Sequence, residues 1–140
     1  MPAQRPVILE ALKTLLKAGV AAVSNRVYLP WEALPEHDAG AMLQIAIDDS
    51  TTDAGVVIGL WEHTVPVKIG AIKAGKFDYQ AVWDILNAAA AAIQANYTLA
   101  GSVESIEITG QADHLIQGGD RILWPHLAAT ITYRTQRGAL

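Results

Sequence analysis

The strongest pattern of apolar positions in the chain lies in residues 77–97. Its apolar side chains recur at steps of three and four residues, as Val82, Ile85, Leu86, Ala89, Ile93 and Tyr97. This spacing places side chains on one face of a helix. Asp78 is suited to the N-cap position. The alanines of residues 88–92 favour a helix and keep it thin. We therefore predict a helix whose small side allows close approach by a sheet, the first helix or a neighbouring subunit.

The rest of the chain shows one further helical pattern and several alternating ones. The helical pattern covers residues 6–18, with Pro6 in the first turn and Gly19 as a C-terminal stop. Alternating apolar positions predict strands at residues 26–29, 42–48, 56–63, 64–74, 102–109 and 122–135, of which 56–63 and 64–74 could form one long bent strand. This order predicts an α+β fold with a mostly antiparallel sheet of four to five strands and two main helices packed on one face.

Several local features modify this scheme. Prolines and a glycine make residues 30–40 an irregular connection, which includes His37. Residues 48–55 are the most polar stretch and indicate an exposed loop, and residues 110–120 predict a second loop. Pro66 lacks a ladder donor and predicts an edge strand or a bend. A break in the alternation at Ser105 predicts a β-bulge.

Composition bears on how the fold is used. The 140 residues are expected to form a single domain over residues 1–140. Hydrophobic residues make up 51% of the chain and charged residues 17%, below the roughly 25% that is usual for soluble domains. This composition favours a protein whose apolar surface is covered by partner subunits. A well-packed monomer is the alternative.

Charge and residue usage exclude several classes of protein. The net charge is −4 and the basic residues are scattered, which argues against a nucleic-acid partner. Cysteine is absent, so a disulfide framework and thiolate chemistry are excluded. Apolar runs fall short of the roughly 20 residues of a membrane helix, and we expect neither a membrane partner nor a signal peptide.

The sequence contains no recognisable catalytic or cofactor motif. Its four histidines lack the spacing of metal ligands: His37, His63, His114 and His126. The stretch that begins at Asp48 resembles an EF-hand loop, but Asp53 and Gly59 occupy the positions that require glycine and glutamate. We therefore expect no enzyme activity, no cofactor and no metal site.

Polar and aromatic residues are the candidates for an interface. The exposed stretch contributes Asp48, Asp49, Thr51 and Asp53, and the expected break in the sheet contributes Pro66. Three tryptophans near strand ends or in the proline loop are either edge packing or interface anchors: Trp31, Trp61 and Trp124. The fourth, Trp83, is expected to pack within or beside the core.

The arrangement resembles the tail terminator family of long-tailed bacteriophages, also called tail completion or minor tail protein U-like proteins. An N-terminal helix precedes residues 26–28, Arg-Val-Tyr, and a proline-containing loop leads into the strand at residues 42–47. An acidic turn and residues 61–67, Trp-Glu-His-Thr-Val-Pro-Val, follow. The helix from Asp78 and two closing strands that end at residues 131–134, Ile-Thr-Tyr-Arg, complete the order.

This resemblance implies a mechanical function in the virion. Such proteins form a ring, typically hexameric, on the head-proximal end of the tail tube, where the ring stops tube polymerisation and presents the surface that joins the head. The implied partners are further copies of the chain, the tail tube protein and the head–tail connector protein. The implied location is the tail or neck of the virion, after assembly in the host cytoplasm. No catalytic residue is implied.

Three alternatives remain open from the sequence. A head–tail connector or stopper of the phage neck would share the structural role and differ in the surface it binds. A small ligand-binding or enzymatic α+β domain would use His63 or His114 with a carboxylate. An acidic host-directed interaction protein of the ferredoxin-like type would be a monomer or a dimer.

Overall fold

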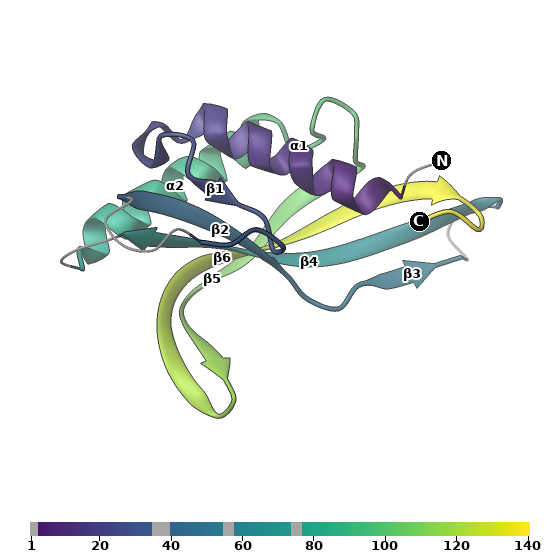
Figure 1. Ribbon diagram of the computed structural model, residues 1–140. Helices are drawn as coiled ribbons and strands as arrows, with labels where there is room; N and C mark the ends of the chain where they lie inside the picture. The colour runs from purple at the N-terminus through teal and green to yellow at the C-terminus, as the bar shows by residue number, and fades with distance from the viewer. Residues whose placement is uncertain (1–2, 35–39, 55–57, 74–76) are drawn as a thin grey trace.

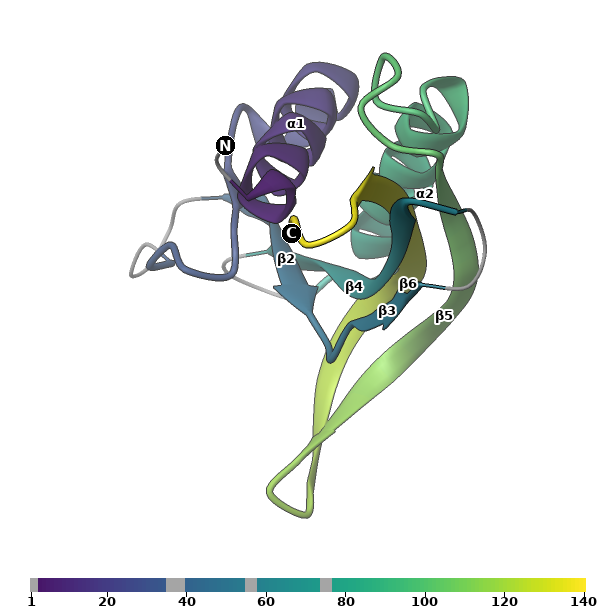
Figure 2. The same cartoon turned by 90° about the vertical axis from the view of Figure 1, so that its right-hand side faces the viewer.

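A computed structural model describes residues 3–34, 40–54, 58–73 and 77–140 of the chain (Figure 1). In these ranges, helices α1 (Gln4–Gly19) and α2 (Tyr79–Ala95) lie side by side on one face of a mixed sheet, as Figures 1 and 2 show. The predicted α+β class and the mostly antiparallel sheet are confirmed. His37 lies outside the described residues, as do the first two residues of the predicted strand 56–63 and the last residue of the predicted strand 64–74.

The sheet of the described chain has the order β1-β2-β4-β6-β5, and β3 pairs with β4 beyond the end of β2. Only β1 and β2 pair in parallel among these strands. The bounds are β1 (Val27–Tyr28), β2 (Ala41–Ile47), β3 (Thr51–Asp53), β4 (Leu60–Lys73), β5 (Ser105–Gln117) and β6 (Asp120–Gln136). The sheet therefore has six strands where four to five were predicted, since residues 51–53 pair as a strand although we expected them to form a loop.

Helix α1 buries one apolar face against the sheet. It begins two residues before Pro6 and ends at Gly19, close to the predicted bounds. Its buried side chains are all at most 2% exposed: Ile8, Leu9, Leu12 and Leu16. Burying each of them stabilises the fold by roughly 1.5–3 kcal/mol, which outweighs the roughly 0–1 kcal/mol of an exposed ion pair.

Helix α2 has the predicted cap and the predicted buried face. The Asp78 carboxylate accepts a hydrogen bond of 3.0 Å from the backbone N–H of Ala81, so it is the N-cap. The buried residues are Val82, Ile85, Leu86, Ala89 and Ile93. The prediction was wrong for Tyr97, which lies beyond the end of the helix and is 53% exposed. The alanine run brings α2 close to α1, because a Cβ added at Gly19 would lie only 2.6 Å from the Cβ of Ala92. We expected a sheet, the first helix or a neighbouring subunit to approach the small side of α2. The structure shows that the first helix, α1, does so.

Strand β4 is one long internal strand and not an edge strand. It pairs with β6 along one side and with β2 and then β3 along the other. Pro66 lies where the partner changes from β2 to β3, and its carbonyl accepts a hydrogen bond of 3.0 Å from the N–H of Asp48. Proline has no backbone N–H to donate to a neighbouring strand. It is tolerated at this position because the pairing with β2 has ended there and the pairing with β3 has not yet begun. The edge-strand prediction for Pro66 was therefore wrong.

Strands β5 and β6 form a hairpin much longer than predicted. The turn Gly118-Gly119, with φ values of 59° and 85°, joins strands that continue through residues 110–120, where we predicted a loop. Register shifts lie at Ile108/Gly110 and Ala112/His114 and not at Ser105. Such irregularities bend a hairpin. Figures 1 and 2 show its distal part projecting from the sheet, away from the helices.

Candidate interaction surface

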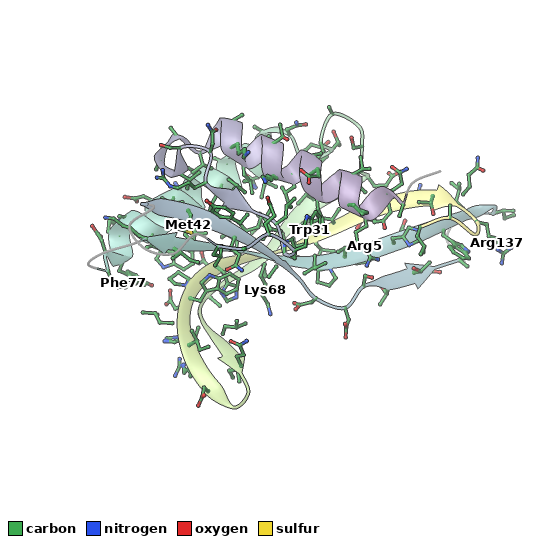
Figure 3. The ribbon with its side chains drawn as sticks, viewed as in Figure 1. Arg5, Trp31, Met42, Lys68, Phe77 and Arg137 are labelled. Carbon is green, nitrogen blue, oxygen red and sulfur yellow. The ribbon has the colours of Figure 1, made fainter. Side chains whose placement is uncertain are left out.

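The predicted polar interface residues lie in the connection from β2 to β3 and along β3. Asp48, Asp49, Thr51 and Asp53 are exposed between the end of β2 and the end of β3. Asp48 forms an ion pair of 3.3 Å with the ammonium group of Lys68. Figure 3 shows Lys68 on the face of the sheet opposite to the helices. The hydrogen bond from Asp48 to Pro66 brings these two predicted residues together.

The three predicted tryptophans do not form one cluster with these residues. Trp31 is 55% exposed and lies in the turn after β1 (Figure 3). Trp61 is half-buried near the beginning of β4, opposite Thr135 of β6. Trp124 is half-buried beyond the other end of the β4–β6 pairing, next to Gly70. The structure therefore separates Trp61 and Trp124 by most of the length of β4.

The Trp31 turn is held to α1 by Glu32. The Glu32 carboxylate accepts hydrogen bonds from the ammonium group of Lys13, at 2.6 Å, and from the N–H of Leu29, at 2.9 Å. The hydrogen bond from Lys13, followed by the one from Leu29, lowers the pKa of Glu32 below its ordinary value. This arrangement presents the exposed Trp31 indole from a tethered turn.

Buried His63 connects three strands and the C-terminal segment. Its Nδ1 lies 2.9 Å from Thr52 Oγ1, and its Nε2 lies 2.8 Å from Thr135 Oγ1. The Thr135 hydroxyl donates to the carbonyl of Ala139 at 2.7 Å. It must therefore accept from Nε2–H of His63, which leaves Nδ1 to accept from Thr52. This network satisfies a neutral imidazole, and neither ring nitrogen contacts a carboxylate through these bonds.

A carboxylate at the base of the projecting hairpin joins it to α2. The Tyr79 hydroxyl lies 3.0 Å from both oxygens of Asp113, and the indole N–H of Trp83 donates to Asp113 Oδ1 at 3.0 Å. The hydrogen bond of the Tyr79 hydroxyl to Asp113 is the main reason why the pKa of Tyr79 is raised above its ordinary value. Sequence reasoning missed this site because residues 110–120 were expected to form a loop. The adjacent polar and aromatic residues show no spacing that would reveal it.

The distal part of the hairpin exposes apolar side chains. We call residues 110–127 the arm and residues 114–123 its tip. Ile116 is 77% exposed, Leu123 is 49% exposed and Ile122 is 41% exposed. Arg121 lies opposite Ile116, with its guanidinium 3.2 Å from Nδ1 of His114. Apolar side chains projecting so far from the core are typical of an interaction site.

The described residues bear on two further classes of site, metal-binding and membrane-spanning. No group of three or more histidine, aspartate or glutamate side chains there is placed to hold a metal ion. Within the same ranges, neither helix is long and apolar enough to cross a membrane.

Comparisons with known proteins add no relative. No family model matches the chain, and a search of curated proteins finds no match to it.

Proposed function

We propose that this protein is a structural subunit of a bacteriophage tail, a tail terminator that forms a ring on the head-proximal end of the tail tube. The ring stops polymerisation of the tube and provides the surface to which the head is joined. The proposal rests on the resemblance in the order of elements and on one observation in particular. This observation is the arm, which carries exposed Ile116, Ile122 and Leu123 away from the rest of the fold.

An arm of this kind suits assembly from identical subunits. A contact between a projection on one copy and a different surface on the next copy is heterologous, and such contacts generate rings when the rotation closes. Closure also makes weak individual contacts sufficient, because each further contact forms at high effective concentration. A hexamer is the ring that the resemblance implies.

The acidic side of the sheet provides a second surface for partners. Asp48, Asp49, Thr51 and Asp53 are exposed there beside Pro66. In the proposed ring this side faces the tail tube protein or the connector protein, where its charge would select a basic counterpart.

Capping of purified tail tubes tests this function. We expect electron micrographs to show a ring at one end of each tube, and tube subunits added afterwards should no longer extend that end. Native mass measurement with and without tubes gives the number of subunits. A ring that binds tubes without stopping their growth would instead favour the head–tail connector or stopper. A protein that leaves tubes unbound would contradict both.

A further inference from the structure

The tip of the arm presents an apolar and basic face. Because residues opposite each other in a hairpin share a face, Ile116 and Arg121 lie on the same side as the opposing pair His114 and Leu123. Ile116 and Leu123 are 77% and 49% exposed, and they are flanked by the guanidinium and the imidazole. This face is therefore an apolar patch beside one positive charge, that of the Arg121 guanidinium.

A groove of complementary character lies at the base of the arm. Two adjoining hollows, of about 360 and 640 Å³, share Tyr79 and Gln80 as lining residues. We call them together the base groove. It is lined by the aromatic rings of Phe77, Tyr79 and Trp83, by the carboxylate of Asp113, and by Lys73 and Asp78, which form an ion pair of 4.0 Å.

The base groove is aromatic and exposed. Phe77 and Tyr79 are 48% and 50% exposed. The ring centroid of Tyr79 lies 6.3 Å from that of Phe77 and 6.4 Å from that of Trp83. A row of aromatic rings open to solvent is the type of surface on which interface anchors pack.

The base groove also contains a negative charge. Asp113 is held by the hydroxyl of Tyr79 and the indole N–H of Trp83. Both donors are neutral, so these bonds orient the carboxylate and leave its charge in place. The raised pKa of Tyr79 has this carboxylate as its main cause. A guanidinium such as that of Arg121 would complement this charge.

We propose that the tip of the arm of one subunit docks into the base groove of the next subunit. Apolar Ile116 and Leu123 pack on the aromatic row, and Arg121 approaches Asp113. The arm cannot make this contact within one chain, because its tip projects away from α2 and from its own base (Figures 1 and 2). Both halves of the contact occur in every copy, so the occupant of the groove is a second copy of this chain. This inference deepens the proposed function and rests on its self-assembly.

Cross-linking between two single-cysteine variants tests the contact. The natural chain has no cysteine, so Gln117→Cys labels only the tip and Gln80→Cys labels only the groove. Both side chains are exposed, and neither substitution removes an apolar contact residue. With a short bis-maleimide, a mixture of the two variants should give covalent dimers, and each variant alone should give few. The samples are studied in solution and with tail tubes present.

The substitution Ile116→Asp provides a second test, in which self-association is measured. Ile116→Asp should raise the dissociation constant of self-association roughly ten- to 100-fold, since a buried isoleucine is lost. Ile58→Asp is the matched control, because Ile58 is fully exposed and lies near Arg137, at the end of the molecule opposite to Phe77 (Figure 3). It should assemble like the natural chain.

Distinct outcomes separate this contact from the proposed function. The docking is overturned if the natural chain caps tubes while the mixed variants remain uncross-linked. It is also overturned if Gln117→Cys cross-links alone as well as in the mixture, which would indicate tip-to-tip contact. Dimers formed only in the mixture support the docking even if the tubes continue to grow, a result that would overturn only the terminator function.

Discussion

The indole of Trp124 lies directly over Gly70, so closely that a Cβ at this glycine would overlap with the indole carbons. Trp124 also stacks on His126, with ring centroids 4.8 Å apart and an angle of 26° between the planes. The missing side chain of Gly70 therefore provides the place for Trp124 at the base of the arm. This accounts for Trp124 as packing, while its role as an interface anchor stays a prediction.

We predict that Gly70→Ala destabilises the protein by about 1–3 kcal/mol, the usual cost of overpacking a well-packed site. Urea denaturation followed by tryptophan fluorescence measures the free energy of unfolding. Gly110→Ala is the control, because a Cβ there would lie 4.0 Å from that of Ala128, an ordinary contact. If Trp124 is the obstacle, Gly70→Ala should cost much less in a Trp124→Ala background. Equal costs in both backgrounds would contradict this explanation.

The sequence predicted those parts of the fold in which apolar residues face a common core. The buried residues of each helix, such as Leu12 in α1 and Leu86 in α2, recur at helical spacing. Val65, Val67 and Ile69 alternate along β4. All of these side chains are buried in the same core. The cap at Asp78 was readable for a local reason, since a carboxylate satisfies a free N–H three residues later.

The parts that were missed lack this relation to a core. Residues 110–120 pair as strands without covering a buried face, so apolar and polar residues do not alternate along them, and the turn Gly118-Gly119 was the only readable sign of a hairpin. The Asp113 site joins residues 30 and 34 positions apart in the chain. Its geometry depends on the bend of the arm, which no local pattern specifies.

We predict that enlarging the small side of α2 disturbs its contact with α1. Ala92 lies against Gly19, so Ala92→Leu should destabilise the protein by about 1–3 kcal/mol through overpacking. The neighbouring Ala91 is exposed, and Ala91→Leu should change the stability by less than about 0.5 kcal/mol. Thermal denaturation of both variants compares the two sides of the helix. Similar melting temperatures of the two variants would show that the space between α1 and α2 can accept a larger side chain.

Stability should depend on pH through His63. Burial, followed by the nearby charge of Arg5, lowers the pKa of His63 in the folded protein below its ordinary value of 6.5. Above pH 6.5 the imidazole is neutral in both states. As the pH falls below that value, the unfolded chain binds a proton first, so stability declines until the pH reaches the folded-state pKa. Urea denaturation at several pH values across this interval measures the effect.

Substitution of His63 separates its contribution from that of other groups. His63→Phe retains a ring that can stack on Tyr133, but it leaves the Thr135 and Thr52 hydroxyls without this partner. We expect a loss of about 1–3 kcal/mol above pH 6.5 and a weaker dependence on pH below it. His114→Asn, at an exposed position, should retain the natural dependence. An unchanged pH dependence in His63→Phe would exclude His63 as its source.

Asp113 should control the ionisation of Tyr79. The phenol loses a hydrogen bond to this carboxylate when it deprotonates, and the phenolate is then repelled by the same charge, so the pKa of Tyr79 is raised. In Asp113→Asn the pKa of Tyr79 should move down towards the ordinary tyrosine value. Tyrosinate absorbance measures this, with Tyr79→Phe identifying the signal. Asp84→Asn, on the same helix, should leave the pKa where it is in the natural chain.

The same carboxylate should determine how firmly the arm is attached. Asp113 connects the base of the arm to Tyr79 and Trp83, whereas the tip is held by strand pairing and by the contact between Arg121 and His114. In Asp113→Ala we expect faster amide hydrogen exchange in residues 110–117, because this tether is lost, and unchanged exchange in β4, whose pairing is intact. Faster exchange throughout the sheet would instead show that Asp113 supports the whole fold. Unchanged exchange in the arm would show that strand pairing and the bend are sufficient to hold it.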